Sequence, residues 1–203
     1  MKINRITTID LLRHGACEGG EIFRGSTDVA LSESGWQQMH AALVEETGWR
    51  RIFTSPLQRC RVFAEQLAET RELPLHVVDD LRELHFGDWE GRRLQDIERE
   101  ESATLQQFWR DPMQVTPPNG EAMADFRQRV LNAAEQIINA HAGEHILVIA
   151  HGAVIRMLLG EWLQMAMTAF SNIAVPYAGF SRVRIFYREG FEPWVQLCVH
   201  RGE

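Results

Sequence analysis

The sequence has few cysteines, and their positions show no paired spacing. Cys17, Cys60 and Cys198 are an odd-numbered set, which indicates neither a disulfide framework nor a cysteine-based zinc site. Among the histidines, only His141 and His145 have the spacing of metal ligands on a helix, and no third ligand accompanies them. We therefore expect reduced thiols and no metal site.

The sequence also lacks an apolar run long enough to span a membrane. Its longest runs, Ile146–Ala150 and the Ala153–Leu159 run that Arg156 interrupts, are far shorter than the roughly 20 residues needed. The N-terminal residues Met1–Thr8 show no apolar segment or cleavage pattern of a secretory signal. We therefore expect a cytoplasmic protein with no membrane partner.

Positive charge is scarce. Lys and Arg total 21 against 28 Asp and Glu, which leaves a formal net charge of −7. Such a balance provides no global attraction to nucleic acid, so we expect no nucleic-acid partner and any basic cluster must be local. The hydrophobic share of 45% and the charged share of 24% are typical of a globular protein.

Predicted strands and helices alternate along the chain. Short apolar segments predict strands at 8–12, 51–54, 75–78 and 146–150, and helical spacing predicts helices at 32–46, 56–68, 92–110, 121–142 and 153–164. Two later segments, 181–187 and 194–200, follow each other closely enough to pair antiparallel at a sheet edge. We expect the α/β class: a three-layer α/β/α sandwich with a mostly parallel sheet and an antiparallel edge.

A proline-rich segment interrupts this order. Residues 111–120 hold three of the seven prolines, which indicates the boundary of an insertion. We expect one domain over residues 1–203, because its length is that of a typical domain, with 92–120 as a partial lid. The oligomeric state, monomer or homodimer, stays open.

Charged and histidine side chains follow the predicted parallel strands, where ligands bind in such sheets. Arg13 and His14 follow the first strand, Arg59 the second, Glu83 the third and His151 the fourth. Guanidinium groups match phosphate oxygens, and a histidine can act as a nucleophile. A glutamate beside bound phosphate is suited to protonate the leaving oxygen. The combination favours phosphoryl transfer from a small-molecule phosphomonoester.

Four motifs stand in order along the chain: Leu11–Gly15 (LLRHG), Ser55–Arg59 (SPLQR), Glu83–Gly91 (ELHFGDWEG) and Ile149–Gly152 (IAHG). Together they resemble the signatures of the histidine phosphatase superfamily, in its phosphoglycerate-mutase-like branch. The segment Pro118–Glu121, before the predicted long helix, is similar as well.

The resemblance implies a role for each matching residue. His14 attacks phosphorus to form a phosphohistidine, and Arg13, Arg59 and His151 bind the equatorial oxygens, with Gly152 in the same phosphate site. Glu83 is the proton donor, and no metal or other cofactor is required. Arg24 and Glu121 are further candidates for substrate contacts.

Some roles have competitors among neighbouring residues. Glu90 and Asp88 compete with Glu83 for the role of the acid. Phe86, Trp89 and Trp109 are candidates for the lining of a pocket for an aromatic leaving group, although aromatic residues are more often part of the core.

The sequence departs from the family pattern at two positions. Gly20 stands where many relatives have an asparagine that contacts phosphate, and Ala122 stands where relatives often have serine or threonine. We expect phosphate binding to survive both departures and leaving-group contacts to differ.

The resemblance leaves the substrate open. Mutases of this branch carry paired arginines in a longer insertion, whereas Asp111–Gly120 holds none, so a phosphatase is favoured. The N-terminal and Phe86–Glu90 motifs resemble most the α-ribazole-5′-phosphate phosphatases of cobalamin synthesis. The alternatives are a phosphoglycerate mutase-like enzyme, a broad-specificity sugar or metabolite phosphatase, and an inactive phosphate-binding interaction module.

Overall fold

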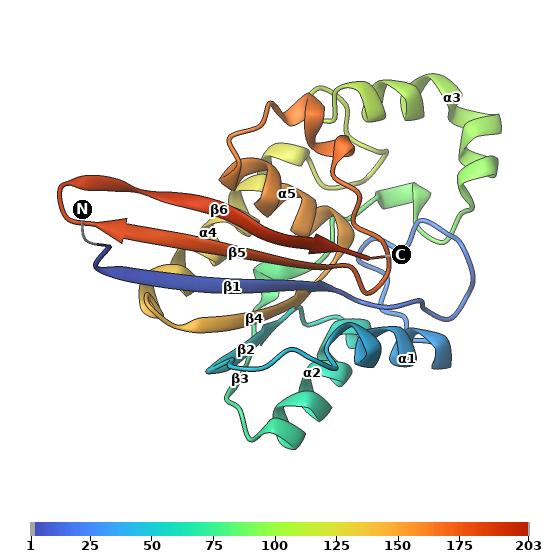
Figure 1. Cartoon of the computed structure of the whole chain (residues 1–203). Helices are drawn as coiled ribbons and strands as arrows, with labels where there is room; N and C mark the ends of the chain where they lie inside the picture. Colours follow the sequence, from blue (N-terminus) through green and yellow to red (C-terminus); the bar gives the residue numbers. More distant parts are fainter. Residues whose placement is uncertain (1–2, 203) are drawn as a thin grey trace.

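The computed structural model describes residues 3–202 and has a six-stranded sheet at its centre, in the order β3-β2-β4-β1-β5-β6 (Figure 1). Four strands are parallel: β1 (Arg5–Arg13), β2 (Arg51–Thr54), β3 (Leu75–Val77) and β4 (His145–Ala150). The last two, β5 (Phe180–Arg188) and β6 (Phe191–Arg201), form an antiparallel edge. This topology confirms the predicted α/β fold.

Five α-helices and three short 3-10 helices complete the described chain. The α-helices are α1 (Glu33–Ala42), α2 (Gln58–Arg71), α3 (Leu94–Arg110), α4 (Met123–Ala140) and α5 (Gly152–Trp162). The 3-10 helices are η1 (Asp79–Leu81), η2 (Gly87–Trp89) and η3 (Met167–Asn172). The ends of the α-helices agree with the predicted ones to within four residues. The two largest differences are at the end of α1, which stops at Ala42, and at the end of α2, which extends to Arg71. The helix η3 was not predicted, because its sequence MTAFSN is too short to show a helical period.

Each face of the sheet packs against its own layer of helices. Along β4, Ile146, Val148 and Ala150 belong to one core with residues of α4 and α5, whereas Leu147 and Ile149 belong to another with residues of α1 and α2. Successive side chains of a strand point to opposite faces, so an uninterrupted aliphatic strand fills two cores. This produces the α/β/α layers.

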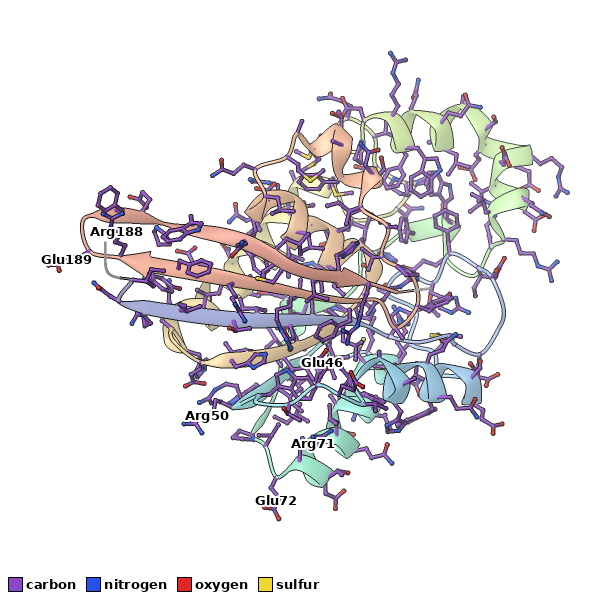
Figure 2. The ribbon with its side chains drawn as sticks, in the orientation of Figure 1. Glu46, Arg50, Arg71, Glu72, Arg188 and Glu189 are labelled. Atoms are coloured by element: carbon purple, nitrogen blue, oxygen red, sulfur yellow. The ribbon has the colours of Figure 1, made fainter. Side chains whose placement is uncertain are left out.

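The two ends of the sheet differ in character. Arg188 and Glu189 lie at the turn between β5 and β6, at one end (Figure 2). Helix α3 lies toward the opposite end, beyond the carboxyl end of β1 (Figure 1). Its backbone bends at Glu101, which has non-helical dihedral angles.

Two glycines bring the segment after β1 against the start of α1. A Cβ atom on Gly15 would lie 2.2 Å from the carbonyl oxygen of Gly35, and one on Gly35 would lie 2.0 Å from that of Ala16. Ser32 caps α1 by accepting a hydrogen bond from the Gly35 N–H. The absence of side chains at both glycines therefore lets the helix support the residues next to His14.

Candidate active site

Side chains from three strand ends and from the following segments reach one cavity at the carboxyl edge of the parallel strands. This cavity, of about 410 Å³, is lined in part by Arg13, His14, Arg24, Arg59 and Glu83. We refer to it as the cationic cavity. A nearby cavity of about 340 Å³ shares Arg13 and Glu83 with it, as well as Phe86 and Trp109.

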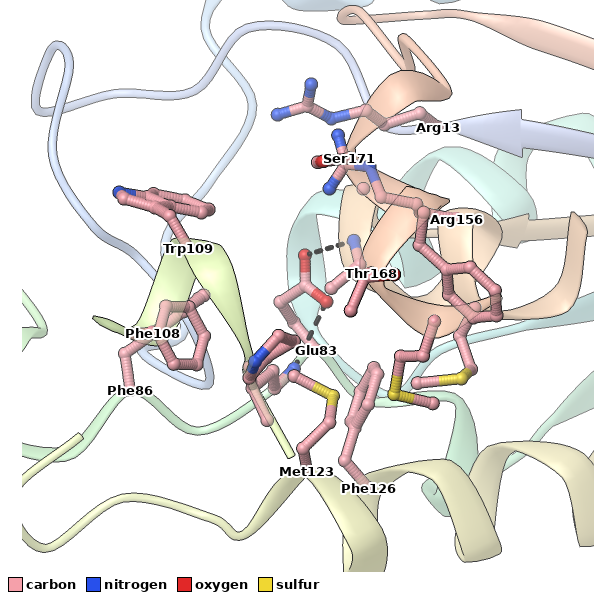
Figure 3. A pocket seen from close by; sticks show the side chains of 17 residues that line it. Arg13, Glu83, Phe86, Phe108, Trp109, Met123, Phe126, Arg156, Thr168 and Ser171 are labelled. Carbon is pink, nitrogen blue, oxygen red and sulfur yellow. Dashed lines mark hydrogen bonds between the residues drawn. The ribbon is translucent and has the colours of Figure 1, made fainter. Parts of the chain in front are cut away.

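The second cavity is mostly apolar, and we call it the apolar chamber. Its other lining residues are Leu84, Phe108, Pro112, Met123, Phe126, Gly152, Ala153, Arg156, Met157, Met167, Thr168, Phe170 and Ser171. Figure 3 shows Trp109, Phe108 and Phe86 on one side, Arg13 and Arg156 on the other, and the Glu83 carboxylate between them. The chamber therefore combines aromatic walls with a few charged groups.

The contacts of His14 define which of its ring nitrogens carries the proton. Its Nδ1 lies 2.8 Å from the carbonyl oxygen of Gly15. Because a carbonyl can only accept, Nδ1 carries the proton and Nε2 keeps its lone pair. Burial, and after it the charges of Arg59 and Arg13, lower the pKa of His14 well below its ordinary value. The imidazole is therefore neutral and nucleophilic near neutral pH.

Arg59 lies at the start of α2 and is almost fully buried. It donates from Nη1 to the Thr27 carbonyl at 2.8 Å, from Nη2 to the Gly25 carbonyl at 2.6 Å, and from Nε to Nδ1 of His151 at 3.3 Å. A guanidinium has more N–H groups than these contacts use, so donors remain for a ligand. Arg59 thus also holds the segment 25–27 in place.

His151 is fully buried and does not line either cavity. Its Nδ1 accepts from Arg59, so Nε2 carries the proton and donates to Ser55 Oγ at 2.6 Å. Its ring contacts that of His14 edge-on, with centroids 5.3 Å apart. Burial, followed by Arg59 and His14, lowers the pKa of His151 well below its ordinary value. His151 therefore contacts both Arg59 and His14. The structure does not bring it to the cavity that Arg13 and Arg59 line.

Arg13, at the end of β1, faces both cavities. Its Nη1 donates to the Val175 carbonyl, and its Nε is buried without a hydrogen-bond partner. Burial lowers the pKa of this guanidinium. Gly152 lies directly beside it, since a Cβ atom there would be 3.4 Å from Arg13 Nε.

Of the three candidate acids, only Glu83 lines the cavities. Its carboxylate accepts from the Leu84 and Ala153 backbone N–H groups at 3.1 and 3.2 Å. Glu90 instead joins two segments by accepting from Ser26, Thr27 and the Phe86 N–H, and these bonds outweigh burial and lower its pKa. Asp88 accepts from the Asn119 side-chain amide at 3.0 Å.

Comparison with known proteins agrees with this geometry. The model of the histidine phosphatase superfamily (branch 1) matches residues 9–194. The chain belongs to this superfamily.

Three relatives are between 25% and 34% identical in sequence to this chain. The bifunctional protein Rv2228c of Mycobacterium tuberculosis is 34% identical over 189 residues, 91% of this chain and 51% of that protein, so the chain spans about half the length of this relative. The adenosylcobalamin/alpha-ribazole phosphatase of Salmonella typhimurium is 28% identical over 185 residues, 89% of this chain and 91% of that protein. The solved alpha-ribazole phosphatase of Shigella flexneri is 25% identical, with a TM-score of 0.78 and 96% of each chain covered.

The superfamily is one of phosphatases, and the Salmonella typhimurium relative is named as one. Within residues 3–202, no cluster of three His, Cys, Asp or Glu side chains has the geometry to hold a metal ion. None of the helices described is both long and apolar enough to cross a membrane.

The two remaining candidates for substrate contacts differ in position. Arg24 lines the cationic cavity, donates to the carbonyls of Cys17, Glu18 and Gly20, and has a buried Nε without a partner. Glu121 lines neither cavity and forms an ion pair with Arg129 at 2.6 Å. The structure therefore offers no support for a substrate contact by Glu121, whose carboxylate anchors the start of α4.

The two departures from the family pattern have local consequences in this histidine phosphatase. Gly20 contributes its carbonyl oxygen to Arg24, so a cation occupies the neighbourhood of the missing asparagine. Ala122 is the N-cap of α4 and provides no side-chain cap. Of the three aromatic candidates, Phe86 and Trp109 line both cavities, whereas Trp89 is fully buried and donates to Glu101 at 3.0 Å.

The cavity walls include residues that were not predicted from the sequence, and two of them bear on the chemistry of the site. Tyr177 lines the cationic cavity, and Arg156 lines the apolar chamber. The sequence carries a signal for Arg156, which is the one charged residue within the apolar segment Ala153–Leu159. Tyr177 precedes β5, which pairs with β1 and begins where β1 ends, so its position depends on the assembled sheet.

Proposed function

We propose that this histidine phosphatase hydrolyses phosphomonoesters through a phosphohistidine at His14. Nε2 of His14 attacks phosphorus, and the bond from phosphorus to the ester oxygen breaks as the new P–N bond forms. Glu83 gives its proton to the leaving oxygen. In the second step water attacks phosphorus, Glu83 accepts a proton from it, the P–N bond breaks, and inorganic phosphate leaves.

The cations of the cationic cavity supply the electrostatic part of the mechanism. Arg13 and Arg59 line the same cavity as His14. In the proposed reaction they stabilise the charge that spreads over the phosphoryl oxygens. His151 and Gly152 do not line this cavity, and we propose that they position its arginines, since Gly152 lies beside Arg13 and His151 contacts Arg59. His151 acts by orienting Arg59 through its Nδ1.

The observation that carries this proposal is the junction of the two cavities at Arg13 and Glu83. A phosphoryl group bound beside His14 has its ester oxygen directed past Glu83 into the apolar chamber. The aromatic walls of that chamber suit a leaving group with an apolar ring. The segment 92–120 contributes Leu94, Phe108, Trp109 and Pro112 to the walls, and we propose that it acts as the lid.

The names of relatives point to one such substrate. α-Ribazole 5′-phosphate has a dimethylbenzimidazole ring on a ribose phosphate, which fits an aromatic chamber next to a phosphate site. We propose this ester as the preferred substrate, in cobalamin synthesis, over sugar phosphates and phosphoglycerates, which have no apolar ring to bury.

The test compares EDTA-treated wild type and His14→Ala on α-ribazole 5′-phosphate, p-nitrophenyl phosphate and glycerol phosphate. We expect wild type to favour the ribazole ester and His14→Ala to be inactive on all three. An alkaline quench preserves phosphohistidine, so intact-mass spectrometry should find one added phosphoryl group on wild type alone. His76→Ala, at an exposed histidine, is the matched control and should behave like wild type. Activity that survives in His14→Ala would disprove the mechanism, and equal rates on all three esters would disprove the substrate preference.

A further inference from the structure

Arg156 is a charged residue of the apolar chamber that the proposed reaction does not use. The chamber has three charged lining residues, and the other two, Arg13 and Glu83, belong to the junction with the cationic cavity. Arg156 lies on α5, whose other residues between Ala153 and Leu159 are apolar. A charge inside an apolar helix face costs desolvation unless something compensates it.

The contacts of Arg156 leave most of its donors unused. Its Nε donates to the Ile173 carbonyl at 3.1 Å. Among residues 3–202, no carboxylate forms a salt bridge with it. Its guanidinium points into the chamber beside Ser171, on the side of Arg13 (Figure 3). The two terminal nitrogens are therefore available to a ligand.

Two arginines of the neighbouring helix α4 form ion pairs with glutamates. Arg127 on α4 forms a bidentate ion pair with Glu161 of α5, at 2.6 and 2.7 Å. Arg129 is paired with Glu121. Among the described residues, Arg156 lacks a salt bridge, as does Arg13, the other arginine of the chamber, and Glu83 is the one carboxylate of the chamber lining.

We propose that Arg156, with the hydroxyl groups of Thr168 and Ser171, binds a hydrogen-bond acceptor of the leaving group within the chamber. This inference rests on the proposed function, and it defines the substrate class as a phosphomonoester whose apolar ring bears an acceptor. Two chemical sources provide such an acceptor: a carboxylate on the ring, or a ring nitrogen such as that of α-ribazole. A guanidinium donates to both, and its hydrogen bonds to a carboxylate are the stronger because both partners are charged.

The experiment uses three substrates that differ in the hydrogen-bond acceptor that the ring of the leaving group carries. 2-Naphthyl phosphate has an apolar ring without an acceptor, 6-carboxy-2-naphthyl phosphate adds a carboxylate, and α-ribazole 5′-phosphate has the ring nitrogen. The variants are Arg156→Met, which keeps the length of the stem, Arg156→Lys, which restores the charge, and Arg127→Gln as the control on the surface of the same helix pair.

We expect Arg156→Met to lower kcat/KM for an acceptor-bearing substrate by about 10- to 100-fold relative to 2-naphthyl phosphate, the size of a lost charged hydrogen bond. Arg156→Lys should recover part of this preference, and Arg127→Gln should leave it unchanged. A loss confined to the carboxylate substrate identifies an anionic natural substrate. A loss confined to the ribazole ester, or shared by both acceptor-bearing esters, identifies a ring nitrogen as a sufficient acceptor.

Two results would overturn the inference. One is an unchanged preference in Arg156→Met, and the other is an equal loss on all three substrates, since that would place Arg156 on the phosphoryl group or in the fold. Binding of the alcohol 6-hydroxy-2-naphthoate, compared with 2-naphthol by calorimetry, requires no catalysis. It should weaken in Arg156→Met even if His14 proves not to be the nucleophile, so failure of the mechanism and failure of this inference remain distinguishable.

Discussion

The guanidinium of Arg13 lies over the ring of Tyr177, 4.3 Å from the ring centroid. The same ring contacts the imidazole of His14 at a centroid distance of 5.7 Å, and its hydroxyl accepts from Arg24 Nη1 at 3.1 Å. One side chain from the segment before β5 therefore contacts the proposed nucleophile and two cations of its cavity. The neighbouring Ala178 N–H also donates to the His14 carbonyl.

Tyr177→Ala is predicted to lower kcat on an aryl phosphate by about 2- to 30-fold, the range of a lost cation–π contact. Tyr177→Phe keeps the ring and loses only the hydroxyl contact to Arg24, so its effect should be smaller and should appear mainly in KM. Steady-state kinetics of both variants test this. Equal losses in the two variants would show that the ring does not position Arg13 and His14.

Glu83→Gln is predicted to affect esters according to the basicity of the leaving group. For an alkyl phosphate, loss of the proton donor should reduce kcat/KM by about 10²- to 10⁴-fold. For p-nitrophenyl phosphate the loss should be much smaller, because nitrophenolate leaves without a proton. Asp88→Asn, in the same motif but outside the cavity linings, serves as the control. An equal loss on both esters would argue against Glu83 as the acid.

The acid limb of kcat/KM should lie below pH 6.5. Burial and nearby arginines lower the pKa of His14 from its ordinary value of 6.5, so the reactive neutral form persists as the pH falls through that value. The measurement requires an aryl phosphate whose second phosphate pKa lies below the pKa of His14, so that ionisation of the substrate does not mask that of the enzyme. Arg24→Met removes one of the charges that lower this pKa, so the limb should move to higher pH. A wild-type midpoint at 6.5 or above would contradict the prediction.

Asp10→Asn is predicted to lower the free energy of unfolding by about 3 to 5 kcal/mol, the usual cost of breaking a buried ion pair. The fully buried carboxylate accepts from Arg182 at 2.6 and 2.7 Å, from His145 at 2.9 Å and from Trp49 at 2.7 Å. Chemical denaturation measures the difference. Asp80→Asn, at an exposed carboxylate, should change the same quantity by less than about 0.5 kcal/mol.

The contribution of Asp10 should also depend on pH. Burial raises its pKa, but the bonds from Arg182, His145 and Trp49 outweigh that and hold it below the ordinary value of 3.8. A lowered pKa in the folded state means that the stabilisation is complete above pH 3.8 and disappears as the pH falls through the folded value. The gap between wild type and Asp10→Asn should therefore shrink in acid. A gap that stays constant there would show that the charge of Asp10 does not stabilise the fold.

Periodicity was enough to predict the layers of the fold. The aliphatic segment Ile146–Ala150 can be buried on both faces only at the centre of a covered sheet, and the structure places β4 there, between β1 and β2. The carboxyl ends of parallel strands meet at one edge, so the order of motifs along the chain also predicted which residues gather there. Arg13, His14, Arg59 and Glu83 do line one cavity.

Which residues face a ligand was decided only by tertiary packing. The spacing of the motif favoured Glu83 over Glu90, but the contacts that separate them come from Ser26 and Thr27, which are distant in sequence and bind Glu90. Arg156 and Tyr177 belong to the site because α5 and the start of β5 converge beside Arg13, and no local spacing encodes that meeting. The sequence by itself determined the fold and the family, since these depend on local periodicity and short motifs, and the same motifs led to the proposed chemistry. The tautomer of His14, the junction of the two cavities and the unpaired Arg156 depend on long-range contacts, which exist only once the chain has folded.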